Sequence, residues 1–262
     1  MKLQLETSSY QQVEILYDEL SEYYHFLYTD IEGINKKIAQ ELDLKLLKPL
    51  GIQKILDCSC GTGHMIIELA KLGYEVTGSD ISGKMIERSI SNAIRAGIKN
   101  INFFQTNILD LSSNIKEKFD AVICRGNSFS HIEPNDFEIA IKNMGTLLKK
   151  GGLCYIDIRN YEAVIQEKPL FEHRAHLQFG SKDIVSFYIL DYKENSRTYN
   201  IFFVFFDRES NSISHKLVTI DGYFVFEDDL LRAFKNAGFE NIKKMQLENE
   251  SKDINILRGT KI

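Results

Sequence analysis

Tryptophan is absent from the 262-residue chain, proline occurs three times and cysteine four times. Four cysteines are too few for the disulfide framework of a small secreted domain. Cys58 and Cys60 are too close in sequence for an ordinary disulfide, and they lack the Cys-x-x-Cys spacing of a zinc knuckle. These two, Cys124 and Cys154 all lie in apolar segments, so we predict four small, buried core residues.

Long apolar runs and an excess of basic residues are also missing. No run reaches the roughly 20 residues that a membrane helix needs, and the N-terminus lacks the apolar region of a signal peptide. The 32 basic and 37 acidic residues give a formal charge of −5, which disfavours nucleic acid as a partner. We therefore expect a cytoplasmic protein without a membrane or nucleic-acid partner, for which an oligomer is possible.

The middle of the chain alternates short apolar runs with segments of helical spacing. Strands are predicted at residues 53–60, 74–80, 101–107, 119–125, 153–159, 240–248 and 254–262. Helical segments separate most of them, and this alternation is typical of βαβ units. The sequence therefore predicts an α/β fold with a doubly wound, mostly parallel seven-stranded sheet.

The pattern differs on either side of this alternation. Two helical segments, at residues 9–28 and 30–48, precede it, and three runs typical of antiparallel strands follow residue 163. We predict four parts: a helical N-terminal cap at 1–48, a Rossmann-like core at 49–162, an antiparallel β lid insertion at 163–225 and a C-terminal completion of the core at 226–262. The lid would cover the edge where parallel strands end, which is where open α/β sheets bind ligands.

The stretch "LDCSCGTGH" at residues 56–64 is a glycine-rich turn between a predicted strand and a predicted helix. It places Asp57, Ser59, Gly61 and Gly63 in the pattern acid-x-small-x-Gly-x-Gly. A dinucleotide fingerprint would have a third glycine where Ile66 stands, and a Walker loop would end in Gly-Lys-Ser/Thr. The turn therefore favours a ligand other than a pyrophosphate.

Asp80 ends the next predicted strand, about 20 residues after the turn. An acid there can accept hydrogen bonds from both ribose hydroxyls, and the alternative is a helix N-cap. The turn and this acid together resemble class I S-adenosylmethionine-dependent methyltransferases. The resemblance implies S-adenosyl-L-methionine as cofactor, with S-adenosyl-L-homocysteine as product. It also implies that Asp57 orients the turn or meets the ammonium of the cofactor through water; the alternative is a loop cap.

Further residues match the cofactor-binding positions of that family. Ile81 and Met85 match the apolar residues that flank the adenine. Asn107 and Ile108, in "QTNIL", match the segment near the adenine amino group, where an acid is commoner than asparagine. Arg125, at the end of the fourth predicted strand, belongs to the same edge. Glycine would let the backbone N–H groups of the turn approach the methionine carboxylate.

Two segments, "FDAVICRGNSFSHI" and "IDIRNYEAVI", resemble glycine N-methyltransferases and related glycine/sarcosine methyltransferases. The likeness covers about residues 50–160 and is poor across 163–220. It implies that Arg159, whose planar fork suits a carboxylate, holds the acceptor, and that Asn127 is a second polar contact. The alternatives are a salt bridge from Arg159 to Asp157 or to a surface acid, and a turn role for Asn127.

Histidines and tyrosines near these segments can have structural roles as well as functional ones. We expect His131 to be structural, and we expect His173 and His176 to bind no metal, because a third ligand is missing. Tyr161 should pack beneath Arg159. The N-terminal tyrosines that either line the pocket or pack in the core are Tyr17, Tyr23, Tyr24 and Tyr28.

The leading hypothesis is a methyltransferase that moves a methyl group to a small-molecule acceptor, such as the amine of glycine or sarcosine. A second hypothesis is a methyltransferase for another small metabolite or a natural-product intermediate. An NAD-linked oxidoreductase and a non-catalytic module that retains the cofactor belong to other classes. Methyl transfer to nitrogen is an in-line displacement that needs positioning and no metal.

Overall fold

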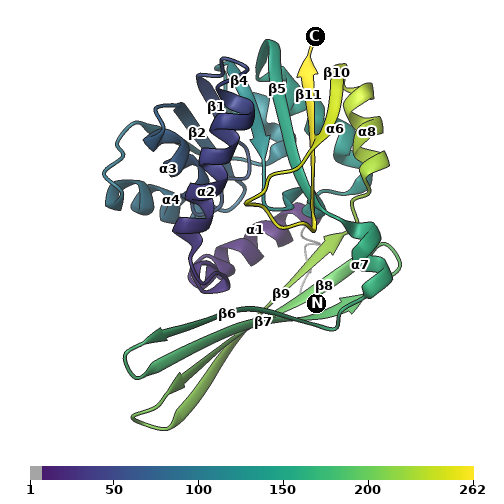
Figure 1. Ribbon diagram of the computed structural model, residues 1–262. Coiled ribbons are helices and arrows are strands. Elements are labelled where there is room, and N and C mark those ends of the chain that lie inside the picture. The colour runs from purple at the N-terminus through teal and green to yellow at the C-terminus, as the bar shows by residue number, and fades with distance from the viewer. Residues whose placement is uncertain (1–7) are drawn as a thin grey trace, which may run out of the picture.

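Two β-sheets form the framework of the protein, and the computed structural model describes residues 8–262 (Figure 1). One sheet has seven strands in the order β10-β11-β5-β4-β1-β2-β3, and the other has four in the order β6-β7-β8-β9. The strands are β1 (Lys54–Asp57), β2 (Glu75–Asp80), β3 (Ile101–Gln105), β4 (Phe119–Cys124), β5 (Leu148–Arg159), β6 (Phe171–Phe179), β7 (Lys182–Tyr192), β8 (Ser196–Asp207), β9 (Ser212–Tyr223), β10 (Phe239–Met245) and β11 (Ile254–Lys261).

The larger sheet is mostly parallel, as the sequence predicts. β1 pairs in parallel with β2 and β4, while β11 runs antiparallel to both β5 and β10. Strands such as β1 are continuous apolar runs because both faces of the sheet are covered; Ile55 and Leu56 are fully buried. The prediction of a doubly wound α/β fold is confirmed.

Helices cover both faces of this sheet (Figure 1). They are α1 (Ser9–Leu20), α2 (Ile31–Leu42), α3 (His64–Lys71), α4 (Gly83–Arg95), α5 (Leu111–Asn114), α6 (Phe137–Thr146), α7 (Tyr161–Glu167) and α8 (Glu227–Asn236), together with short 3-10 and π segments. One apolar cluster joins α6 and α8 to the sheet, and another joins α2 and α3 to it. All four cysteines are free and buried, as predicted.

The N-terminal segment departs from the prediction of one helix over residues 9–28. α1 ends at Leu20, and a separate 3-10 helix spans Tyr24–Leu27. Ser21 Oγ donates to the carbonyl of Asp18 at 2.8 Å, and such back-bonding competes with the regular helix.

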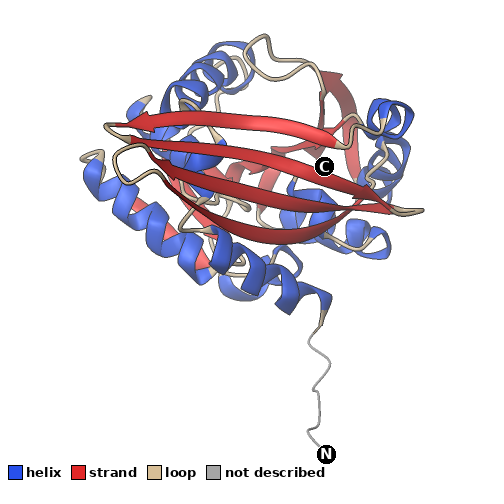
Figure 2. Cartoon of the chain, turned by 90° about the horizontal axis from the view of Figure 1, so that it is seen from below, coloured by secondary structure: helices blue, strands red, loops and turns tan. Residues whose placement is uncertain are grey.

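The four-stranded sheet is the predicted lid, with one strand more than the sequence indicates. β6 was not predicted, because "FEHRAHLQF" lacks a clean alternation and its pairing with β7 shifts register between His173 and Ala175. The lid lies below the end of the larger sheet in Figure 1, and Figure 2 shows its open outer face. The boundaries of the four predicted parts stay a prediction.

An apolar cluster fastens the lid to the core through α1 and α4. Leu20 of α1 and Met85 of α4 are buried together with lid residues such as Tyr199 and Phe203. The lid is therefore held over the carboxyl ends of β1, β2 and β4. Among residues 8–262, no helix is long and apolar enough to cross a membrane.

Candidate active site

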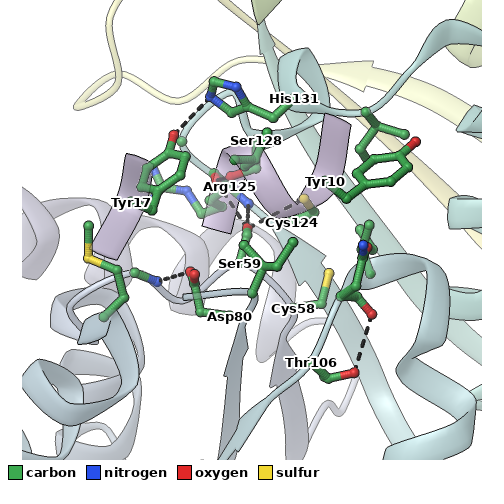
Figure 3. Close-up of a pocket in the computed structure, with 18 of the residues that line it drawn as sticks. Tyr10, Tyr17, Cys58, Ser59, Asp80, Thr106, Cys124, Arg125, Ser128 and His131 are labelled. Atoms are coloured by element: carbon green, nitrogen blue, oxygen red, sulfur yellow. Dashed lines mark hydrogen bonds between the residues drawn. The ribbon is translucent and has the colours of Figure 1, made fainter. Parts of the chain in front are cut away.

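Two adjoining cavities lie at the carboxyl edge of the larger sheet. The first is bounded by the ends of β1, β2, β3 and β4 with α1 across it (Figure 3). The second has a volume of about 580 Å³ and extends to β5, α7 and β6 of the lid. Tyr24, Ser59, Gly61 and Arg125 line both cavities, so the two are continuous.

The glycine turn joins β1 to β4 through Ser59. Its hydroxyl donates to the carbonyl of Arg125 at 3.2 Å and accepts from the Arg125 N–H at 3.1 Å. Its own N–H donates to Asp57 Oδ1 at 3.1 Å. The serine, which stands where glycine is commonest, therefore fastens two loops at the mouth of the first cavity.

The two glycines of the turn have different roles. Both have positive φ, +53° at Gly61 and +81° at Gly63, which disfavours other residues. A Cβ on Gly61 would meet nothing within 4 Å, whereas one on Gly63 would lie 2.9 Å from Ser89 Oγ and 3.2 Å from Ser89 Cα. Gly61 thus leaves open space beside the cavity, and Gly63 permits close packing on α4.

Asp80 ends β2 inside the first cavity with its carboxylate almost buried. Oδ2 accepts from the N–H of Gly61 at 2.8 Å, and Oδ1 accepts from that of Ser82 at 3.0 Å. Burial raises the pKa of Asp80 to about 6, which the backbone hydrogen bonds partly oppose. The N-cap of α4 is Ser82, whose side chain accepts from the N–H of Met85, so Asp80 is not that helix's cap residue.

Two more buried carboxylates surround Arg125. Burial raises the pKa of Asp57 to about 7 and that of Asp157 to about 6, and the charge of Arg125 opposes both shifts. Arg125 Nε lies 3.2 Å from Asp157 Oδ2, and its Nη2 also contacts Glu250. This side of the site carries more buried negative than positive charge, so it suits a cationic ligand.

Apolar side chains and loop caps form the remainder of the first cavity. Ile81, Met85 and Ile108 line it, with Met85 fully buried. Asn107 Oδ1 accepts from the N–H of Leu109 at 3.0 Å and so caps a short 3-10 helix. The structure brings these predicted cofactor residues to one cavity together with Ser59, Gly61, Asp80 and Arg125.

Tyr17 and His131 meet at the upper wall of this cavity (Figure 3). Nδ1 of His131 lies 3.1 Å from the carbonyl of Asp221, which can only accept, so Nδ1 carries the proton. Nε2 therefore accepts from the Tyr17 hydroxyl, at 2.8 Å. Burial lowers the pKa of His131 to about 4, so the ring is neutral near pH 7. His131 has the structural hydrogen bonds that we expected and also faces the cavity.

Asn127 connects the end of β4 to the end of β5. It has positive φ, at 62°, and its Oδ1 accepts from the N–H of Arg159 at 2.9 Å. Its Nδ2 donates to Tyr161 Oη at 2.9 Å and to Ser130 Oγ at 3.1 Å. The side chain borders the second cavity while these bonds hold it in the turn arrangement that was the alternative for this residue.

Arg159 lines the second cavity at the end of β5. The alternative of a salt bridge to Asp157 is wrong, because Asp157 pairs with Arg125 and accepts from the N–H of Asn127. Instead, Arg159 Nη1 lies 3.3 Å from both carboxylate oxygens of Glu172 on β6. The arginine is thus paired with a lid residue that was not predicted.

Arg197, which lies close to Arg159, is a residue that the sequence patterns did not single out. Arg197 on β8 is fully buried, its guanidinium lies 5.7 Å from the ring centre of Tyr161, and the aromatic ring against Tyr161 is that of Phe224. The signal was available, since Arg197 shares the inward-facing register of Tyr199.

The fold places some of the remaining predicted residues in the cavities and the others outside them. Tyr17 and Tyr24 line the first cavity, Tyr28 lines the second, and Tyr23 packs on the lid ring of Phe203 at 5.3 Å. His173 and His176 lie on a strand, where His176 Nε2 is 3.0 Å from Asp183 Oδ1. Across residues 8–262, no three His, Cys, Asp or Glu side chains are grouped as metal ligands would be.

Comparison with known protein families matches residues 55–152 to the methyltransferase domain family. Human glycine N-methyltransferase is 33% identical over 135 residues, which are 47% of this chain and 46% of that protein. Glycine/sarcosine N-methyltransferase from Aphanothece halophytica is 33% identical over 128 residues, 48% of each chain. The chain spans about half the length of the curated relatives it matches.

Solved structures match over nearly the whole chain. DesVI from Streptomyces venezuelae has a TM-score of 0.72 at 14% identity and covers 92% of this chain and 95% of its own. An S-adenosylmethionine-dependent methyltransferase from Clostridium acetobutylicum has a TM-score of 0.69 at 18% identity, with 96% and 98% covered. At these identities the likeness establishes the fold, lid included.

Proposed function

Since residues 55–152 form a methyltransferase domain within a class I methyltransferase fold, we propose that the protein transfers a methyl group from S-adenosyl-L-methionine to a small-molecule acceptor. The main support for this proposal is the buried Asp80 carboxylate, which lies beside the open face of Gly61 in the first cavity. The domain match favours this reaction over that of an NAD-linked oxidoreductase.

The first cavity fits S-adenosyl-L-methionine in the chemistry of its lining. Asp80 would accept from the ribose hydroxyls, and Ile81, Met85 and Ile108 would enclose the adenine. The buried carboxylates of Asp57 and Asp157, which line the adjoining second cavity, favour the positive end of the cofactor where the two cavities meet. When bound, the cofactor supplies an electrophilic methyl group on a sulfonium.

We assign the acceptor to the second cavity, between β5 and the lid, with its nitrogen reaching the adjoining first cavity, which Tyr17 and His131 line. Its nitrogen must present a free lone pair, form the bond to the methyl carbon and afterwards lose a proton. Because the Tyr17 hydroxyl donates to His131, its oxygen lone pairs remain available to accept an N–H from the acceptor. Tyr17 would orient the nitrogen, and the neutral His131 would hold Tyr17 in place.

Arg159 supports an acceptor that carries a carboxylate, and glycine or sarcosine would satisfy it. The second cavity, at about 580 Å³, lies within the range of roughly 300–1,000 Å³ that small-molecule sites occupy and is far larger than glycine requires. That size favours, as a second candidate, a larger amine such as a natural-product intermediate. The acceptor is therefore proposed as a class, an amine bearing an anionic group.

Ligand binding tests the cofactor assignment directly. We expect S-adenosyl-L-homocysteine to raise the melting temperature of the protein and to bind in calorimetry, with NAD as the matched control. Stabilisation by NAD alone would contradict the proposal. Binding of S-adenosyl-L-homocysteine with no methyl transfer to any amine in a broad panel would identify a non-catalytic binding module instead.

Labelled methyl transfer to glycine, sarcosine and larger amino acids tests the acceptor. We expect Arg159→Gln to raise the acceptor KM about 10- to 100-fold, because a charged hydrogen-bond pair contributes about 1.5–3 kcal/mol. S-adenosyl-L-homocysteine affinity should stay unchanged, which separates a lost acceptor contact from a damaged fold. An unchanged acceptor KM would show that Arg159 makes no acceptor contact.

A further inference from the structure

Two arginines meet a single carboxylate beside the second cavity. Arg159 at the end of β5 and Arg197 on β8 both approach Glu172, which lies 3.3 Å from Arg159 Nη1 and 3.6 Å from Arg197 Nη1. Two positive charges thus share one negative charge. Arg174 adds a third guanidinium nearby, 5.0 Å from the ring centre of Tyr188.

Arg197 is the unusual member of this group, because its side chain is fully buried. Within residues 8–262, none of its three guanidinium nitrogens has a hydrogen bond of good geometry, although the Tyr192 and Tyr199 hydroxyls lie close to them. Its charge rests instead on aromatic faces, with the guanidinium 4.4 Å from the ring centre of Tyr199 and 5.7 Å from that of Tyr161. Buried charged donors without acceptors are costly, so this arrangement indicates a missing anion.

Glu172 occupies the position of this anion, but its hydrogen-bond geometry is poor. Both of its oxygens meet the same nitrogen of Arg159 at 3.3 Å, whereas a bidentate arginine–carboxylate pair uses two parallel bonds of roughly 2.7–2.9 Å. One oxygen, Oε1, is the atom on which Arg159 and Arg197 converge. That point marks the preferred position of an anionic oxygen.

The position of Glu172 lets it move away. It lies on β6, the edge strand of the lid sheet, and the pairing of β6 with β7 shifts register directly after His173. Glu172 lines the second cavity and is partly exposed, while Arg197 does not line the cavity. Rotation of Glu172 toward solvent would open the converging nitrogens of Arg159 and Arg197 to a ligand.

We propose that Glu172 is an internal stand-in for the anionic group of the methyl acceptor, and that Arg197 joins Arg159 in holding that group once Glu172 is displaced. This inference rests on the proposed function for the identity of the ligand, whereas the anion site itself does not. It assigns to the lid a specificity role that selects a carboxylate-bearing amine over a neutral or purely cationic one.

Acetate serves as the probe, with acetamide as its uncharged control, in calorimetric titrations with and without S-adenosyl-L-homocysteine. We expect Glu172→Gln to bind acetate about tenfold more tightly than the wild-type protein if Glu172 fills the site in nine molecules of ten. The matched control is Glu194→Gln, which removes an exposed lid carboxylate in the β7–β8 turn. It should leave acetate affinity unchanged, and acetamide should bind none of the variants detectably.

Adding Arg197→Met to Glu172→Gln should abolish the gain in acetate affinity, because methionine fills space without supplying charge. Retained S-adenosyl-L-homocysteine binding would show that the double variant is folded; if it is not, the single Glu172→Gln variant decides. Unchanged or weaker acetate binding by Glu172→Gln would overturn the inference and make Glu172 a structural partner. Tighter acetate binding without any S-adenosyl-L-homocysteine binding would instead overturn the proposed function and leave the anion site standing.

Discussion

The core side and the lid side of the site carry opposite charges and stabilise them differently. On the core side, the carboxylates of Asp57, Asp80 and Asp157 each accept a backbone N–H at 2.8–3.1 Å. On the lid side, Arg159 and Arg197 share the carboxylate of Glu172 at 3.3–3.6 Å. The core-side carboxylates have backbone donors in the protein alone, whereas on the lid side all three guanidinium nitrogens of Arg197 lack a hydrogen bond of good geometry within residues 8–262.

This difference reflects how each side is built. Backbone N–H groups of the turns are placed by the strands and helices that flank them, so the cofactor side is rigid before any ligand binds. The lid-side charges come from β5 of the larger sheet and from β6 and β8 of the lid sheet, so they meet only through the packing of the lid against the core. Residues of the lid can therefore be changed without disturbing the turn.

The largest effect should follow from breaking the core side at Asp80. Asp80→Asn keeps the shape but loses the charge and one acceptor oxygen, so we expect S-adenosyl-L-homocysteine affinity to fall about 100-fold, or about 2.7 kcal/mol. Calorimetry measures this, with Asp110→Asn, an exposed acid of the next loop, as control. Equal losses in the two variants would mean that Asp80 has no special role.

A second test disturbs the packing of the turn without changing its charges. Gly63→Ala should lower the free energy of unfolding by about 2 kcal/mol, because it adds a steric clash with Ser89 to the positive φ. Gly97→Ala, at φ +75° with nothing within 4 Å, carries the backbone strain alone and should lose about 1 kcal/mol. Urea unfolding compares the two, and an equal loss would show that the contact with α4 does not matter.

A third test addresses the boundary between the two sides, where Tyr17 meets His131. Tyr17→Phe should lower kcat about tenfold, less than the 10²–10⁴ of a full general base, because it removes an orienting oxygen. S-adenosyl-L-homocysteine affinity should change less than twofold. Tyr23→Phe, whose ring packs on the lid away from the cavities, is the control. If kcat survives the loss of the Tyr17 hydroxyl, the pair is purely structural.

The smallest effect concerns pH. With its pKa raised to about 6, Asp80 is ionised above pH 7 and gains a proton as the pH falls, so it loses its ability to accept ribose hydroxyls. We expect the protonation of Asp80 alone to make S-adenosyl-L-homocysteine affinity about fourfold lower at pH 5.5 than above pH 7, and protonation of Asp57 and Asp157 to add to the decrease. Calorimetry across this range should show the decrease in the wild-type protein and a decrease about fourfold smaller in Asp80→Asn. Affinity that rises on acidification would contradict the assignment.

Local patterns predicted the core side well. The strand, turn and helix around Gly61 and Gly63, and the acid at the end of β2, depend on residues that are neighbours in sequence. The same reasoning missed β6 and α7, because their polar residues do not follow a clear strand or helix period. It also could not assign a partner to Arg159, since Glu172 reaches it only through the packing of the lid sheet against the core.

The sequence alone determined the seven-stranded α/β core, the glycine turn and the position of Asp80, because strand and helix periods and turn glycines are local properties of the chain. Only the tertiary structure decided that Ser59 joins two loops, that Tyr17 donates to His131 and that Arg159 and Arg197 converge on Glu172. These contacts link segments that are distant in sequence, and their distances depend on how the lid and α1 pack against the core.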